Sequence, residues 1–142
     1  MLLGLCIYAT TIPPLALEDR VKLSDHIIIG KVESIKVADR NGDILASQPK
    51  STHIELKLSI TISLKETIKT NNDKIPDKIR TFYGDGLILG VDNEKKRLMG
   101  KEMIFFLKGK DYSPVHDIDF TADIKELSKI KNLLKAQSGK GE

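Results

Sequence analysis

Imidazole and carboxylate groups are the side chains of this chain that could do chemistry, and they form two short clusters. His53 and Glu55 lie two positions apart on an alternating segment, so both could contact one ligand. His116 is followed by Asp117 and Asp119, a set of donors that suits zinc or a similar ion. Neither cluster has a third partner at a fixed spacing. We therefore predict no metal site, no cofactor and no catalytic residue.

Two further polar groups are simpler to interpret as turns. His26 follows Asp25 directly before a β-branched segment, where a cap or turn role is expected. Asp39, Asn41 and Asp43 alternate as in a calcium-binding loop, but the glycine lies before the third of them instead of after it. This spacing predicts a hairpin turn.

A glycine-rich loop is the surface that we would test first for ligand binding. Gly84-Asp85-Gly86 and Gly90 flank an apolar run directly after a predicted strand. Loops on rigid scaffolds often carry binding residues. The alternative is a plain chain reversal, for which glycine is also suited. The candidate ligand-binding residues are Tyr83, Asp85, Leu87, Ile88 and Leu89.

The composition is typical of one soluble globular domain. The chain has 142 residues, of which 40% are hydrophobic and 30% charged. Its formal charge of +3 comes from 23 basic and 20 acidic residues, a near-balance that argues against a nucleic-acid partner. The densest basic run, Lys95-Lys96-Arg97, follows two acidic residues and is interpreted as a solvated loop. Cys6 is the single cysteine, which excludes an internal disulfide and paired-cysteine metal motifs.

The N-terminal stretch Met1–Leu17 contains no charged residue. It is short for a transmembrane helix and contains Pro13-Pro14, so no transmembrane segment is predicted. We expect the apolar part of a signal peptide, cleaved near Ala9–Thr11 or at Ala16, and hence a periplasmic or secreted protein. Because no Lys or Arg precedes the stretch, the alternative is a buried N-terminal strand in a cytoplasmic protein. Residues 18–137 then form one domain, and residues 138–142 a flexible tail.

The segment Thr52–Lys65 gives the clearest structural signal. Apolar and polar residues alternate along its length, which predicts one long strand with a single apolar face. A second predicted strand, His26–Val37, changes its apolar phase near Gly30, which indicates a bulge or sharp bend. A long strand beside a bent one favours a small closed barrel over a flat sheet.

The remaining elements are expected in the following order. They are a helix at Leu17–Leu23, a turn at Asn41-Gly42 with a return through Ile44–Ala46, a strand at Lys78–Tyr83, a charged connection at Asp92–Lys101, strands at Glu102–Leu107 and Tyr112–His116, a helix from an N-cap at Thr121 to Ala136, and a frayed tail at Gln137–Glu142. The last helix has an apolar stripe of Ile124, Leu127, Ile130, Leu133 and Leu134. The side that we expect to face solvent carries Lys125, Lys129, Lys131 and Lys135.

The order of three segments resembles a group of uncharacterised small bacterial exported proteins with an OB-like β-barrel. The segments are LSDHIIIGKVESI (Leu23–Ile35), ITISLKETIK (Ile60–Lys69) and GKEMIFFLKG (Gly100–Gly109). The resemblance covers roughly residues 17–115. It implies a mainly β protein with a small OB-like β-barrel of five to six strands, a short N-terminal helix and a C-terminal amphipathic helix.

Export, a barrel-like strand order and no visible catalytic set favour a non-enzymatic binding or inhibitory module with a protein partner in the cell envelope. One alternative is an enzyme whose acid and base come from His53, Glu55 and His116. Another is a single-stranded nucleic-acid-binding domain, which needs aromatic residues beside basic ones. The polar face of the long strand has no aromatic residue, so nucleic acid is the less favoured partner. The oligomeric state is not predicted.

Overall fold

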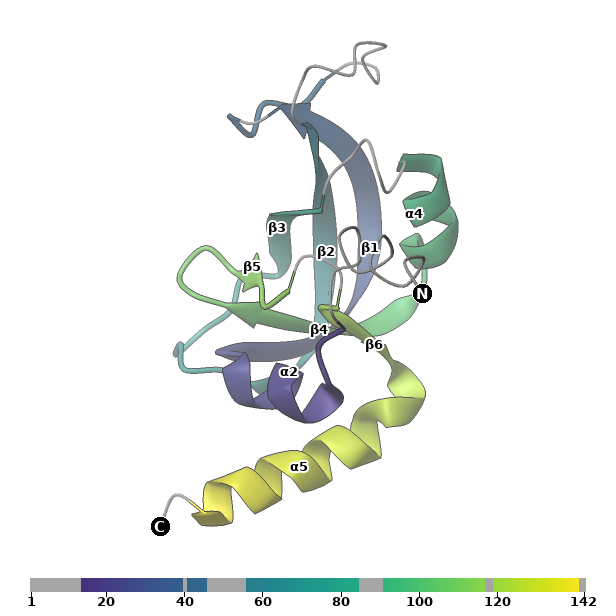
Figure 1. Ribbon diagram of the computed structural model, residues 1–142. Coiled ribbons are helices and arrows are strands. Elements are labelled where there is room, and N and C mark those ends of the chain that lie inside the picture. Colours follow the sequence, from purple (N-terminus) through teal and green to yellow (C-terminus); the bar gives the residue numbers. More distant parts are fainter. Residues whose placement is uncertain (1–13, 40, 46–55, 85–90, 117–118, 141–142) are drawn as a thin grey trace, which may run out of the picture.

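The computed structural model describes residues 14–39, 41–45, 56–84, 91–116 and 119–140. They form a mainly β protein in which a six-stranded sheet curls into a half-barrel, with helices packed around it (Figure 1). The elements in chain order are α2 (Leu17–Leu23), β1 (His26–Asp39), β2 (Leu56–Lys69), β3 (Lys78–Tyr83), α4 (Val91–Leu98), β4 (Glu102–Lys108), β5 (Ser113–Pro114), β6 (Thr121–Asp123), a 3₁₀ turn η1 (Ile124–Glu126) and α5 (Leu127–Lys140). The predicted mainly β class, the strand number, the short N-terminal helix and the C-terminal amphipathic helix are confirmed.

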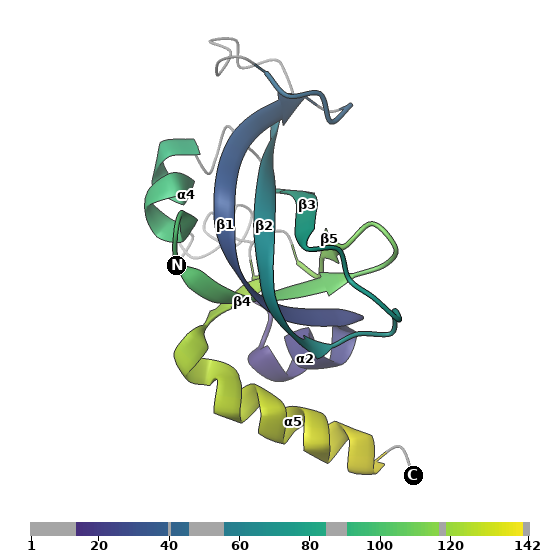
Figure 2. The same cartoon turned by 180° about the vertical axis from the view of Figure 1, so that it is seen from behind.

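The strands pair in the order β3-β2-β1-β4-β5, and β6 pairs with β4 beside this path. Every pairing is antiparallel. The two end strands, β3 and β5, approach each other to within 8 Å between Cα atoms, but the structure records no ladder between them in the part of the chain that it describes. Curling therefore brings the ends of the sheet together at an unpaired seam (Figure 2).

The bend predicted near Gly30 lies in β1, where it pairs with β2. Two register shifts flank this region, one between Ile29 and Gly30 and one between Val32 and Ser34. A Cβ atom added at Gly30 would lie 2.6 Å from the backbone oxygen of Ser63, so only glycine allows this close approach of the two strands. The bend in β1 is confirmed.

The predicted strand at Thr52–Lys65 corresponds to β2, which runs on to Lys69; residues 52–55 lie outside the described part. Its apolar face is confirmed, because Leu58, Ile60 and Ile62 are fully buried. Farther along the strand, Ile68 packs against a different group of apolar residues. One strand thus serves two hydrophobic clusters.

The two clusters lie on opposite faces of the sheet. Ile28 and Val32 of β1 belong to the one inside the half-barrel, whereas Ile27 and Ile29 belong to the one under α2 and α5. Strand β4 alternates in the same way and is buried on both faces, as its continuous apolar run predicted. The phase slip in the sequence therefore marks where β1 changes from continuous burial, up to Gly30, to alternating burial from Lys31 to Val37.

The predicted loop at Asp92–Lys101 is wrong, since Val91–Leu98 forms helix α4. Its acidic residues lie in the first turn and its basic residues in the last, an order that suits the helix dipole. Among its residues from Asp92 onward, only Glu94 and Leu98, one turn apart, are buried against the body. From Asp92 onward the buried positions of the helix are one apolar and one charged residue, which make no apolar periodicity in the sequence.

The predicted start of the last helix at Thr121 is also wrong. Thr121–Asp123 forms strand β6, which pairs with β4, and the Asp123 carboxylate then accepts a hydrogen bond from the Lys125 amide at 3.0 Å. The helix continues through Lys140 instead of fraying after Ala136, and Gln137 Nε2 donates to the Glu18 carbonyl at 3.3 Å. The apolar stripe predicted for this helix is confirmed, because its members pack on the second cluster. Of the expected strand at Tyr112–His116, only Ser113–Pro114 is a strand.

Candidate functional site: a polar groove across the sheet

The loop that the sequence favoured is described only at its beginning. Tyr83 ends β3 and is buried, with 3% of its surface exposed. Asp85, Leu87, Ile88 and Leu89 lie outside the described residues, so their predicted role in ligand binding stays a prediction. Tyr83 itself points into a polar network and not to the surface.

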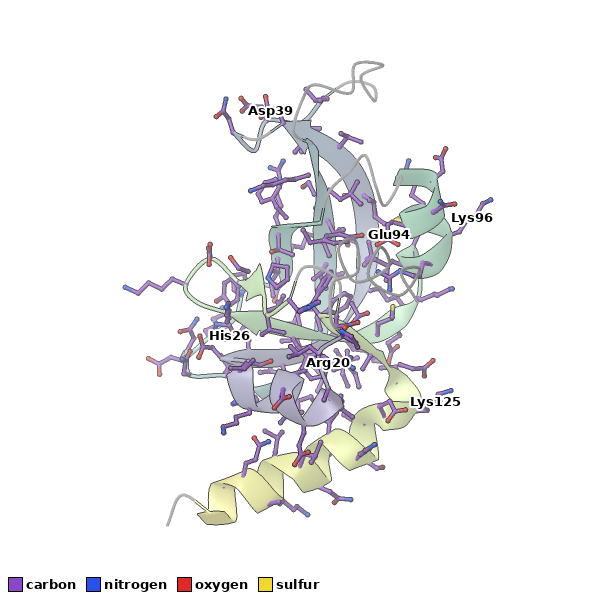
Figure 3. The ribbon with its side chains drawn as sticks, in the orientation of Figure 1. Arg20, His26, Asp39, Glu94, Lys96 and Lys125 are labelled. Atoms are coloured by element: carbon purple, nitrogen blue, oxygen red, sulfur yellow. The ribbon has the colours of Figure 1, made fainter. Side chains whose placement is uncertain are left out.

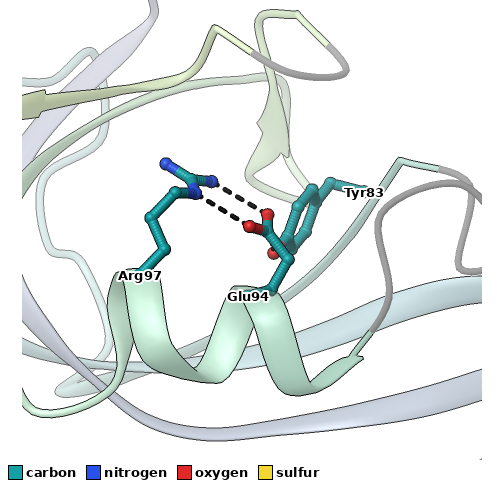
Figure 4. A network of polar contacts seen from close by, with 3 residues as sticks. All are labelled: Tyr83, Glu94 and Arg97. Carbon is teal, nitrogen blue, oxygen red and sulfur yellow. Dashed lines mark hydrogen bonds and ion pairs between the residues drawn. The ribbon is translucent and has the colours of Figure 1, made fainter.

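That network connects α4 to β3 (Figure 4). The Tyr83 hydroxyl donates to Glu94 Oε1 at 2.8 Å, and Arg97 donates from Nε and Nη2 to the two Glu94 oxygens at 2.8 and 2.9 Å. Burial raises the pKa of Tyr83 far above its ordinary value. Burial also acts to raise the pKa of Glu94, but the hydrogen bonds from Arg97 and Tyr83 outweigh it and the pKa is lowered. At neutral pH Tyr83 stays protonated and Glu94 charged, which makes the network a clamp for α4.

His26 has a structural role at the start of β1 (Figure 3). Its Nδ1 lies 2.8 Å from Thr70 Oγ1 and its Nε2 lies 3.0 Å from the carbonyl oxygen of Gly109. Its ring is 4.7 Å from that of Tyr112, which has a positive φ of 55°. The side chain thereby joins the turns that follow β2 and β4, and it is buried away from ligands.

His116 lies near the N-terminal end of the described chain. Its Nδ1 accepts a hydrogen bond from the Asp119 amide at 2.9 Å, and Asp119 Oδ2 accepts one from the Leu15 amide at 2.7 Å. Across residues 14–140, apart from the undescribed gaps, no three His, Cys, Asp or Glu side chains are placed to hold a metal ion. His53 and Glu55 lie in those gaps, as does Asp117, so the enzyme alternative built on His53, Glu55 and His116 stays a prediction.

A groove of about 610 Å³ on the outside of the half-barrel is the candidate site. It lies where β4 separates from β1, and we call it the β1–β2–β4 groove. Its lining residues are Lys31, Val32, Glu33, Ser63, Leu64, Lys65, Gly100 and Glu102. All but Gly100 come from the three strands. Side chains on paired strands are held in fixed positions, which is what a binding site requires.

One row of polar side chains crosses the sheet through this groove. Lys31 of β1 is paired with Ser63 of β2 on one side and with Glu102 of β4 on the other. Ser63 is in turn paired with Lys78 of β3. Directly paired residues project from the same face of a sheet. The four side chains therefore form a continuous polar row over four strands.

The β-bulges add two charged residues to this row. On β2, Lys65 is the extra residue between the pairs Ile29–Glu66 and Gly30–Leu64. On β1, Glu33 is the extra residue between the pairs Val32–Ile62 and Ser34–Thr61. A bulge turns the side chain of its extra residue away from the regular alternation, and bulges are frequent at functional sites.

Each bulge residue forms an ion pair that spans three strands. Lys65 Nζ reaches over β1 to Glu102, with distances of 2.9 and 2.8 Å to its two carboxylate oxygens. Glu33 Oε2 lies 3.2 Å from Lys78 Nζ, so this pair reaches over β2. Both pairs are largely exposed and contribute little to stability. Their effect is to hold both signs of charge at defined positions.

Lys31 lies between these ion pairs and is exposed. Within the described part of the chain its ammonium group has no ion pair or hydrogen bond, which leaves it available to a carboxylate or carbonyl oxygen of a ligand. Leu64, which is partly buried, adds an apolar surface to the groove, whereas Val32 lies beneath it with 1% of its surface exposed. The arrangement can bind a partner that carries charged, hydrogen-bonding and apolar groups together.

The groove residues carry no recognisable signal in the sequence. The alternation along Thr52–Lys65 places Lys65 on the polar side of the predicted strand, and no pattern in the sequence marks Lys31 as a binding residue. The phase slip near Gly30 was a signal of a bulge, but the pairing register that brings Lys65 to Glu102 depends on a third strand far away in sequence.

Comparison of the chain with protein-family models and with curated protein sequences gives no match. No helix within the described ranges is both long and apolar enough to cross a membrane.

Proposed function

We propose that this protein is an exported, non-enzymatic binding or inhibitory module that holds a polypeptide partner in the β1–β2–β4 groove. The observation that carries the proposal is that Glu33 and Lys65 are both extra residues at β-bulges and that both are aimed at the polar row. Besides bending the strand, a bulge re-aims the side chain of its extra residue, and such residues are over-represented next to functional sites.

The mixture of charges supports a polypeptide ligand over a polyanion. Glu33 and Glu102 would repel a phosphate chain, whereas a peptide offers carboxylates, amines, amides and apolar groups to match the groove. The free ammonium of Lys31 suits a carboxylate of such a partner.

The strand order supports an OB-like description of the barrel. Strand β1 pairs with both β2 and β4, and the two end strands β3 and β5 approach each other, as in a five-stranded, partly open Greek-key barrel. Such barrels commonly bind ligands on their strands and loops. The uncharged stretch Met1–Leu17 supports export.

Site-specific photo-crosslinking in the native host tests this function. A photoreactive residue replaces Lys31 in the groove or, as a matched control, Lys36, which is exposed on the same strand outside the groove. We expect a discrete protein adduct from position 31 in the envelope or secreted fraction, weakened when Glu33 and Glu102 are changed to lysine. The absence of an adduct from position 31, or the same adduct from position 36, would contradict the proposal.

A further inference from the structure

The outer side of α5 is a lysine-rich surface. It consists of Lys125 in η1 and Lys129, Lys131 and Lys135 in α5, and we call it the α5 lysine surface. All four side chains are exposed, and Figure 3 shows Lys125 projecting outward where the helix begins. Within the described residues, none of the four ammonium groups forms an ion pair. The charge of this surface is therefore available to a partner.

The positive charge of the protein is concentrated in this segment. Residues 124–140 contain five lysines and one glutamate, a net charge of +4. The whole chain has a net charge of +3, so the remaining residues together carry −1. From Leu127 to Lys140 there is no acidic residue. A charge that is segregated in this way creates a local field that a nearly neutral protein otherwise lacks.

The opposite side of α5 holds the helix in place. Ile130 is fully buried, and Leu127, Leu133 and Leu134 pack on the cluster under α2 and α5. The four lysines are exposed along a helix that extends past the sheet (Figure 1), and Lys129 also lines a shallow pocket with Leu17 and Arg20. A helix of this length spans about 20 Å, which spreads the ammonium groups over a long, convex surface.

We propose that the α5 lysine surface binds an anionic phospholipid membrane at its headgroups. Lysines along one exposed helix side are attracted to the negative potential of such a membrane, and a straight helix can lie flat on it. The surface has no arginine for bidentate phosphate contacts and no aromatic residue for base stacking. A surface of lysines alone, without groups that recognise a base or a single phosphate, suits the planar array of phosphates in a membrane better than it suits a nucleic acid. This site is separate from the β1–β2–β4 groove.

Vesicle co-sedimentation of the full chain tests the inference. The probes are vesicles with phosphatidylglycerol as a third of the lipid and vesicles of pure phosphatidylcholine, both at physiological salt. The test variant combines Lys129→Gln, Lys131→Gln and Lys135→Gln. The matched control combines Lys95→Gln, Lys96→Gln and Lys101→Gln, three lysines exposed on or beside α4.

Wild-type protein and the α4 control are expected to bind phosphatidylglycerol vesicles alone, less strongly as salt rises. Each α5 lysine removed should weaken partitioning about fivefold, and the triple change about a hundredfold. Equal binding by the two triple variants, or no binding by the wild type, would overturn the proposal. Tighter wild-type binding to an oligonucleotide than to the vesicles, lost in the α5 variant, would overturn it in favour of nucleic acid. Circular dichroism of both variants verifies that they are folded.

Discussion

Helix α4 packs on β1 and helix α5 packs on α2, but the two helices use their charges in opposite ways. In α4 a carboxylate faces inward, where Glu94 is bound by Tyr83 and Arg97. In α5 an apolar stripe faces inward and the lysines face outward. The difference shows that the charge content of a helix does not reveal its role. A charged residue holds one helix in place, whereas in the other the charges are left for a partner.

The apolar attachment of α5 is the stronger of the two, and Ile130→Ala breaks it. Ile130 is fully buried, so truncation removes its transfer free energy and leaves a cavity. We expect the free energy of unfolding to fall by about 3 kcal/mol, measured by urea denaturation. Ala136→Ser, at an exposed position of the same helix, serves as the control and should change it by less than about 0.5 kcal/mol. A loss for Ile130→Ala as small as that of the control would mean that α5 is not seated on the second cluster.

The polar attachment of α4 is tested by Glu94→Ala. The change leaves the Tyr83 hydroxyl and the Arg97 guanidinium without their acceptor. Because the Arg97 side chain is 42% exposed and can be rehydrated, we expect a loss of about 2 kcal/mol, below the range for a fully buried pair. Asp92→Ala, an exposed acid in the first turn of α4, should cost only about 0.5 kcal/mol. Equal losses of unfolding free energy for the two variants would contradict the role of Glu94 in attaching α4.

Acid should weaken the α4 attachment selectively. The pKa of Glu94 in the folded chain lies below its ordinary value of 4.5, so its ionised form contributes stability that is complete above pH 4.5 and lost as the pH falls through the folded pKa. The difference in unfolding free energy between wild type and Glu94→Gln should therefore shrink with acidification. Denaturation series at several pH values measure it. The difference between wild type and Lys96→Gln serves as a reference that should stay constant with pH. A difference between wild type and Glu94→Gln that grows in acid would contradict a lowered pKa for Glu94.

The smallest effect on stability is expected on the outer side of α5. The triple change of Lys129, Lys131 and Lys135 to glutamine should alter the free energy of unfolding by no more than about 0.5 kcal/mol, because these side chains are exposed and both residue types favour helices. Thermal denaturation of the purified variant checks this. A large loss would mean that the lysines stabilise the fold and are not reserved for binding.

The contrast between a periodic apolar attachment and an attachment by single polar contacts also explains which elements the sequence predicts. Periodic burial gave β2, β4 and the apolar stripe of α5, because each repeats at the spacing of its element. Helix α4 cannot be predicted from its sequence because, from Asp92 onward, its buried residues are one acid and one leucine, which make no apolar pattern. Thr121 was mistaken for a helix cap because its pairing with Phe105 of β4 depends on tertiary structure. The groove was missed for a related reason, since its charges meet only after two bulges have set the register of the strands.

The most direct test of the proposed function is the affinity of the partner captured through position 31 for three versions of the full chain. These are the wild type, Lys31→Glu in the groove and Lys36→Glu outside it. The account predicts that Lys31→Glu weakens binding at least about tenfold, while Lys36→Glu changes it by less than about twofold. Equal affinities for all three versions, measured by calorimetry, would contradict the assignment of the partner to the β1–β2–β4 groove.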